Sequence, residues 1–130
     1  GGTSWSQVEM YRAPTERQRR LCAAFADWGL PTAEALVEVR AALPEMPVIA
    51  SGGLRSGMDL AKVLALGADL GGLAGPFLKA ANASPQAVAD LALEVADVLR
   101  TAMFSVGITD VAALKGTSLL RRVRTDRGKA

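Results

Sequence analysis

The segment PVIASGGLRSG (residues 47–57) takes an apolar run directly into a glycine-rich loop. A second run of small residues, GADLGGLAGP (residues 67–76), follows after an interval long enough for one helix. We predict a strand before each loop, over residues 48–50 and about 70–74. Two such loops side by side would turn backbone N–H groups toward a phosphate, as at the carboxyl-terminal face of a (β/α)8 barrel.

Helical patterns surround these two strands. We expect a loop over residues 1–13 and helices over residues 15–27 and 32–43, the second capped by Thr32. Ser56, with Asp59 three residues later, predicts a capped helix that ends at Gly67. A helical turn over 77–81, a long helix from Ser84-Pro85 and a last helix over 110–114 complete the pattern. Alternating elements of this kind predict parallel βαβ units and an α/β fold.

Composition narrows the class of protein. The chain has 130 residues, enough for one modest domain, and half of them are hydrophobic. It contains no apolar run long enough to cross a bilayer and no signal segment, so we expect a soluble, cytoplasmic protein. One cysteine and no histidine exclude an internal disulfide, ordinary zinc sites and histidine-based nucleophilic triads. We expect Cys22 to be a buried packing residue.

Positive charge is concentrated at the carboxyl-terminal end of the chain. From Lys115 onward the chain has six basic residues and one acidic residue. Without interleaved aromatic residues, this pattern favours a solvated, flexible tail over residues 116–130 rather than a nucleic-acid-binding segment. Residues 1–115 would then form the folded part. A start at Gly1-Gly2 with no strand before it, together with only two expected strands, predicts that this part belongs to a larger fold.

Five motifs occur in order along the chain: GTSW (2–5), WGLPTA (28–33), VIASGGLRSG (48–57), ALGAD (65–69) and AMF (102–104). Together they resemble the carboxyl-terminal portion of type 2 isopentenyl-diphosphate Δ-isomerase, the FMN-dependent form. The resemblance runs from residue 1 to about residue 115. Each motif alone is weak, since glycine loops after strands occur in many flavin barrels, but the ordered combination is specific.

The resemblance implies a portion of an FMN-binding (β/α)8 TIM barrel. Such an enzyme interconverts isopentenyl and dimethylallyl diphosphate in isoprenoid biosynthesis. It uses FMN reduced by NAD(P)H, together with Mg2+, and we expect a homo-oligomer that binds neither nucleic acid nor membrane. The family's catalytic, metal-binding and substrate-diphosphate residues have no counterparts here, so we expect no catalytic or metal-binding residue in this chain and no activity from the chain alone.

Family residues that contact the cofactor do have counterparts. The resemblance assigns a flavin contact to Thr3 and phosphate contacts to two segments: Gly52, Gly53, Leu54 and Arg55, then Ala74 and Gly75. The side chain of Arg55 is expected either to contact the phosphate or to point to solvent. Trp5 is expected either near the active site or as a packing wedge, and Trp28 in a core or interface.

The sequence alone leaves two alternatives open. The chain could be part of another FMN barrel, an oxidoreductase of the 2-hydroxy-acid or dihydroorotate kind. It could also be a non-catalytic phosphate-binding half-barrel, which would have to pair to cover its open sheet edges.

Overall fold

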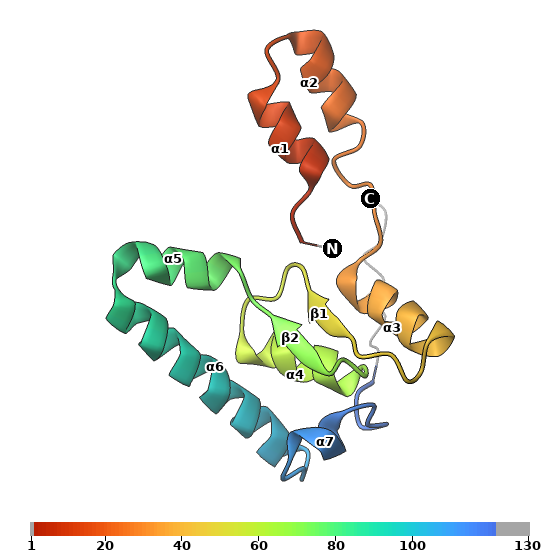
Figure 1. Ribbon diagram of the computed structural model, residues 1–130, viewed down its shortest axis with the longest axis vertical. Coiled ribbons are helices and arrows are strands. Elements are labelled where there is room, and N and C mark those ends of the chain that lie inside the picture. The colour runs from red at the N-terminus through yellow and green to blue at the C-terminus, as the bar shows by residue number, and fades with distance from the viewer. Residues whose placement is uncertain (1, 122–130) are drawn as a thin grey trace, which may run out of the picture.

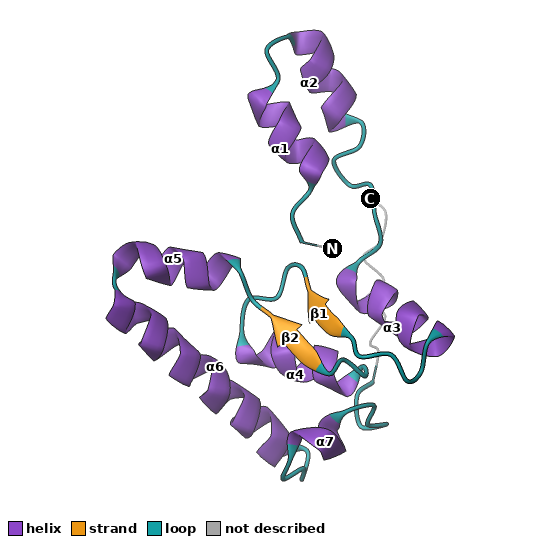
Figure 2. Ribbon diagram, viewed as in Figure 1, coloured by secondary structure: helices purple, strands orange, loops and turns teal. Residues whose placement is uncertain are grey.

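A computed structural model describes residues 2–121 of the chain (Figure 1). Helices predominate and two short strands lie near the centre (Figure 2). In chain order the elements are α1 (Trp5–Arg12), α2 (Glu16–Ala23), α3 (Thr32–Ala42), β1 (Ile49–Ser51), α4 (Gly57–Ala65), β2 (Leu70–Gly72), α5 (Gly75–Ala83), α6 (Pro85–Ser105) and α7 (Val111–Leu114).

The strands β1 and β2 are parallel neighbours and α4 connects them, which confirms the predicted βαβ unit and the α/β class. Ile49 pairs with Leu70 and Ser51 with Gly72. Because both strands run in the same direction, the loops that follow them emerge at the same edge of the sheet. Closure into a barrel would require further strands and stays a prediction.

Three layers form the core: the two strands, then α4, then α6. Leu36, Ala50, Leu54, Val63 and Ala68 make one buried cluster between the sheet, α3 and α4. A second cluster joins α4 to α6 and α7 through Ala61, Leu64, Ala65, Met103 and Leu114. α4 and α6 approach closely at Gly57, where a Cβ would lie 2.3 Å from the Val95 carbonyl oxygen. The absence of a side chain at Gly57 therefore sets the spacing of these two layers.

The sheet face away from α4 is uncovered. Ile49 and Leu70 pair with each other on this face and are 66% and 60% exposed. Large apolar side chains are exposed elsewhere too, including Trp5, Trp28 and Phe104. The α1–α2 hairpin projects away from the layers (Figure 1). Apolar surface of this extent in residues 2–121 indicates faces that are built to pack against further protein.

Several boundaries differ from the sequence predictions. The loop expected over residues 1–13 is interrupted by α1 (Trp5–Arg12), which Ser4 caps by accepting a hydrogen bond from the Gln7 N–H. Thr32 is the first residue of α3 rather than its cap, and its hydroxyl donates a hydrogen bond to the Gly52 carbonyl. α5 begins at Gly75, earlier than the helical turn expected at 77–81.

Other expectations concern single residues and the tail. Cys22 is only partly buried, because α2 contacts little beyond α1. Trp28 is exposed and packs edge-to-face against Phe25, so it is not a core residue of the described chain. Most of the basic tail lies outside the described residues, which end at Arg121. No helix within residues 2–121 is long and apolar enough to span a membrane.

Candidate phosphate-binding site

A cavity of about 620 Å³ lies where the loops after β1 and β2 meet the amino-terminal segment. All seven residues assigned to the cofactor from the sequence line it, and so do five others. The predicted residues are Thr3, Gly52, Gly53, Leu54, Arg55, Ala74 and Gly75, and the additional ones are Gly2, Ser51, Gly72, Pro76 and Lys79. Three segments that are far apart in the sequence therefore meet around one space. Its volume is in the range of small-molecule sites.

The loop after β1 has a backbone conformation that residues other than glycine rarely adopt. Gly52 and Gly53 have φ angles of 106° and 80°, in the region that favours glycine. Gly2 lies so close that a Cβ on it would be 2.6 Å from the Gly52 Cα. The Thr32 hydroxyl donates a hydrogen bond of 2.6 Å to the Gly52 carbonyl and ties the loop to α3. The glycines thus allow the close approach, and Thr32 holds the loop in place.

Backbone N–H groups around the cavity lack acceptors. Those of Gly53, Leu54 and Gly75 donate no hydrogen bond to any atom of residues 2–121. α5 has no side-chain cap, so its first turn keeps free N–H groups at its positive end. The Leu54 side chain is buried in the core, so this residue can offer a ligand only its backbone. Unsatisfied N–H groups at a helix start, next to a glycine loop, favour an anion.

Arg55 contributes through its side chain alone. Its backbone N–H donates to the Asp59 carboxylate at 3.0 Å, while Ser56 accepts from the Asp59 N–H. The predicted capping of α4 by Ser56 is confirmed, but the Asp59 carboxylate reaches one residue further back than the expected box. This bond fixes the backbone of Arg55 beside the cavity. The Arg55 side chain is exposed and lines the cavity.

The charged residues of the lining are both cations. Arg55 follows β1 and Lys79 lies in α5, and the lining contains no aspartate or glutamate. Thr3 and Ser51 add hydroxyl groups. The first turn of α5 also has no acidic residue. The cavity therefore carries a positive local charge, which matches the free N–H groups in favouring an anionic ligand.

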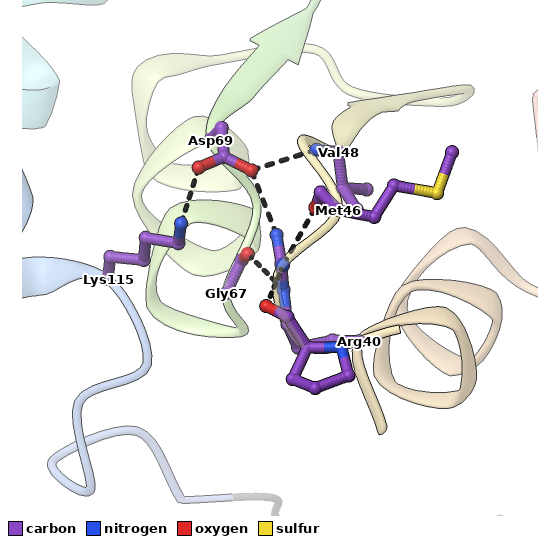
Figure 3. Close-up of polar contacts among 7 residues, drawn as sticks. Arg40, Met46, Val48, Gly67, Asp69 and Lys115 are labelled. Atoms are coloured by element: carbon purple, nitrogen blue, oxygen red, sulfur yellow. Dashed lines mark hydrogen bonds and ion pairs between the residues drawn. The ribbon is translucent and has the colours of Figure 1, made fainter. Parts of the chain in front are cut away.

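Asp69 fixes the opposite ends of the two strands (Figure 3). Its backbone N–H donates to the Val48 carbonyl at 2.8 Å, and its carboxylate accepts from the Val48 N–H at 2.8 Å. The carboxylate also binds the guanidinium of Arg40 at 2.9 Å and the ammonium of Lys115. The hydrogen bond from Lys115, then those from Val48 and Arg40, hold the pKa of Asp69 well below its usual range.

Arg40 extends this network along the chain (Figure 3). Its Nε donates to the Gly67 carbonyl at 2.9 Å, and its Nη1 donates to the Pro44 and Met46 carbonyls at 2.7 and 2.8 Å. Arg40 and Asp69 together fix the starts of β1 and β2 relative to each other. Because each strand is short, a fixed start also fixes where the two loops at the other end lie.

A second cavity, of about 670 Å³, lies between α4, α6 and the segment after α7. Its lining is mainly apolar, and its charged residues are Lys62, Glu94 and Asp97. None of the predicted cofactor residues lines it. The mixed charges and the absence of a glycine loop make it a poor site for a phosphate.

The described residues contain no group of three or more histidine, cysteine, aspartate or glutamate side chains that could hold a metal ion. The single cysteine, Cys22, lies in α2 and does not line the phosphate-site cavity. Among the described residues, the features of this cavity that bear on a ligand are its two cations, its hydroxyl groups and its free N–H groups.

Comparison with known proteins shows which family the chain belongs to. A family model described as FMN-dependent dehydrogenase matches residues 25–121. The chain is 50% identical over 124 residues to isopentenyl-diphosphate delta-isomerase of Nostoc sp., which covers 95% of this chain and 35% of that protein. It is 52% identical over 119 residues to the isomerase of Xanthobacter autotrophicus, covering 92% and 34%. The isomerase of Cronobacter sakazakii is 48% identical over 121 residues, covering 93% and 35%.

The chain thus spans about a third of the length of the curated relatives it matches, with 35% covered for the Nostoc protein. The family model covers most of the chain, including both strands and both loops of the cavity. Four of the five motifs that carried the resemblance, at residues 28–33, 48–57, 65–69 and 102–104, lie within the residues that the family model matches. The chain belongs to the FMN-dependent dehydrogenase family and is homologous to a portion of isopentenyl-diphosphate delta-isomerase.

Proposed function

We propose that this chain forms the FMN-phosphate-binding part of an enzyme that isomerises isopentenyl diphosphate to dimethylallyl diphosphate. The observation that carries the proposal is the cavity: every residue assigned to the cofactor through the resemblance lines it. The identity of about 50% to the isomerases supports the same reading. The family model, with its FMN-dependent description, supports FMN as the ligand.

The lining fits the phosphate end of FMN. The free N–H groups of Gly53, Leu54 and Gly75 would donate hydrogen bonds to its oxygens, and Arg55 would add a charge-assisted contact. Thr3, which lines the same cavity, would contact the flavin part of the cofactor. The FMN, once reduced by NAD(P)H, would supply a flavin that takes part in proton transfer without net oxidation of the substrate. This chain's own residues would bind the cofactor and set its position.

In this proposal β1 and β2 are the last two strands of a (β/α)8 barrel, and α5 is the short extra helix that such barrels use at a phosphate site. The uncovered apolar pair Ile49–Leu70 would face the barrel interior. Residues 1–115 would belong to the barrel and residues 116–130 would form a basic tail. The chain aligns with about a third of the length of its relatives. Mg2+ and the diphosphate substrate would be held by a part of the complete protein that corresponds to the rest of the relatives. Assembly into a homo-oligomer is part of the same proposal.

A second candidate is an FMN-dependent oxidoreductase, since the matching family model is described as a dehydrogenase. Both candidates use the same phosphate site and differ in the chemistry at the flavin. The relatives at about 50% identity favour the isomerase.

An anaerobic assay separates the candidates. The protein expressed from its complete reading frame is incubated with FMN, NADPH, Mg2+ and isopentenyl diphosphate, and the 130-residue chain is assayed beside it. We expect dimethylallyl diphosphate from the complete protein only. A complete protein that binds FMN but forms no dimethylallyl diphosphate, and instead oxidises a 2-hydroxy acid, would contradict the isomerase and support the oxidoreductase.

A further inference from the structure

Lys79 lines the cavity, and the resemblance to the isomerase assigned no role to it. It lies in α5, lines the phosphate-site cavity and is exposed. No carboxylate among the described residues forms an ion pair with it. An exposed cation in the lining of a cavity, without a carboxylate of the described residues paired to it, is available to a ligand.

Helix geometry directs Lys79 toward the free N–H groups. Residues four apart lie on the same face of a helix, so Lys79 lies one turn after Gly75 on that face. Helical side chains lean toward the amino terminus, and a lysine therefore extends over the preceding turn. Gly75 has no side chain in that space, and a Cβ there would meet nothing within 4 Å. The space beside Gly75 is therefore open to the side chain of Lys79.

We infer that Lys79 is a second phosphate-binding cation, which acts from α5 together with Arg55 from the loop after β1 and makes the site selective for FMN over unphosphorylated riboflavin. This inference rests on the proposed function. A phosphate monoester carries a charge of about −1.5 to −2 at neutral pH, because its second pKa is about 6. One arginine balances about half of this charge. Arg55 and Lys79 together balance it, and the cavity contains no carboxylate that would oppose them.

The test compares the affinities of the complete protein for FMN and for riboflavin by fluorescence titration. For Lys79→Gln we expect FMN to bind about tenfold more weakly, the loss of one charged hydrogen bond, and riboflavin to bind within twofold of the unmodified protein. Lys79→Arg keeps the charge and should retain FMN affinity within about threefold. Arg100→Gln is the matched control: it removes one exposed cation from α6, outside the lining, and should change neither affinity.

The outcomes separate this inference from the proposed function. Unchanged FMN affinity in Lys79→Gln would overturn the role of Lys79 while leaving the phosphate site itself intact. Equal weakening of FMN and riboflavin would also overturn it, since a lost packing contact would affect both ligands alike. If the unmodified protein binds riboflavin as tightly as FMN, the proposed phosphate site fails, and the role of Lys79 fails with it.

Discussion

Gly53→Val tests the glycine loop, and Gly107→Val is its matched control. Both glycines have positive φ angles, 80° at Gly53 and 72° at Gly107, so valine is strained at either position. A left-handed backbone costs a non-glycine residue about 1–2 kcal/mol, and a branched side chain adds to this. A Cβ at Gly53 would meet no atom closer than 3.8 Å, and at Gly107 none within 4 Å. The two variants should therefore lose similar amounts of stability.

Only one of the two glycines lines the cavity. Valine at position 53 would stand between a phosphate and the free N–H groups of Gly53 and Leu54. The loss of one hydrogen bond to a charged group costs about 1.5–3 kcal/mol, which corresponds to about a 10- to 150-fold weaker FMN affinity. Gly107 lies after α6, outside the lining, and its variant should bind FMN like the unmodified protein.

The assay is a titration of the complete apoprotein with FMN, together with a thermal unfolding curve for each variant. We expect similar losses of thermal stability in the two variants and weaker FMN binding in Gly53→Val alone. Equal FMN affinities in the two variants would show that the Gly53 backbone does not approach the phosphate, and the proposed role of the glycine loop would be wrong.

Three further predictions concern the frame around the site. Gly57→Ala places a Cβ 2.3 Å from the Val95 carbonyl oxygen, so we expect overpacking between α4 and α6 to lower the free energy of unfolding by about 1–3 kcal/mol in a denaturant titration. Thr32→Val removes the hydroxyl that holds the Gly52 carbonyl, which should weaken FMN binding several-fold with little change in melting temperature. The pKa of Asp69 is lower in the fold than its unfolded value of about 3.9, so Asp69 stabilises the fold above about pH 4, and this contribution is lost as the pH falls further. Unfolding titrations from about pH 6 to 2 should show a steeper loss for the unmodified protein than for Asp69→Asn, and parallel curves would contradict the network.

Local sequence signals predicted the helices that begin directly after a capping serine. Ser56 before α4 and Ser84-Pro85 before α6 were both confirmed as helix starts. The same chemistry was present at Ser4, whose side chain accepts from the Gln7 N–H, but the glycine pair before it favoured a loop. Ser4, followed three residues later by Gln7, matches a capping box and could have predicted the start of α1.

Contacts between distant residues could not be predicted from spacing alone. Arg40 and Asp69 are 29 positions apart, and neither belongs to a motif that points to the other. Lys79 lines the cavity because α5 begins at Gly75, and the sequence placed the helical turn two residues later. The resemblance predicted seven residues that line the cavity. It did not predict the groups that hold them in place, which are the Thr32 hydroxyl and the Arg40–Asp69 pair.

We propose that the cavity between the two glycine loops holds the phosphate of FMN. A crystal structure of the complete protein with FMN would show where the phosphate binds. We predict the phosphate in this cavity, within hydrogen-bonding distance of the N–H groups of Gly53, Leu54 and Gly75. An FMN phosphate bound away from these three residues would overturn the assignment of this cavity.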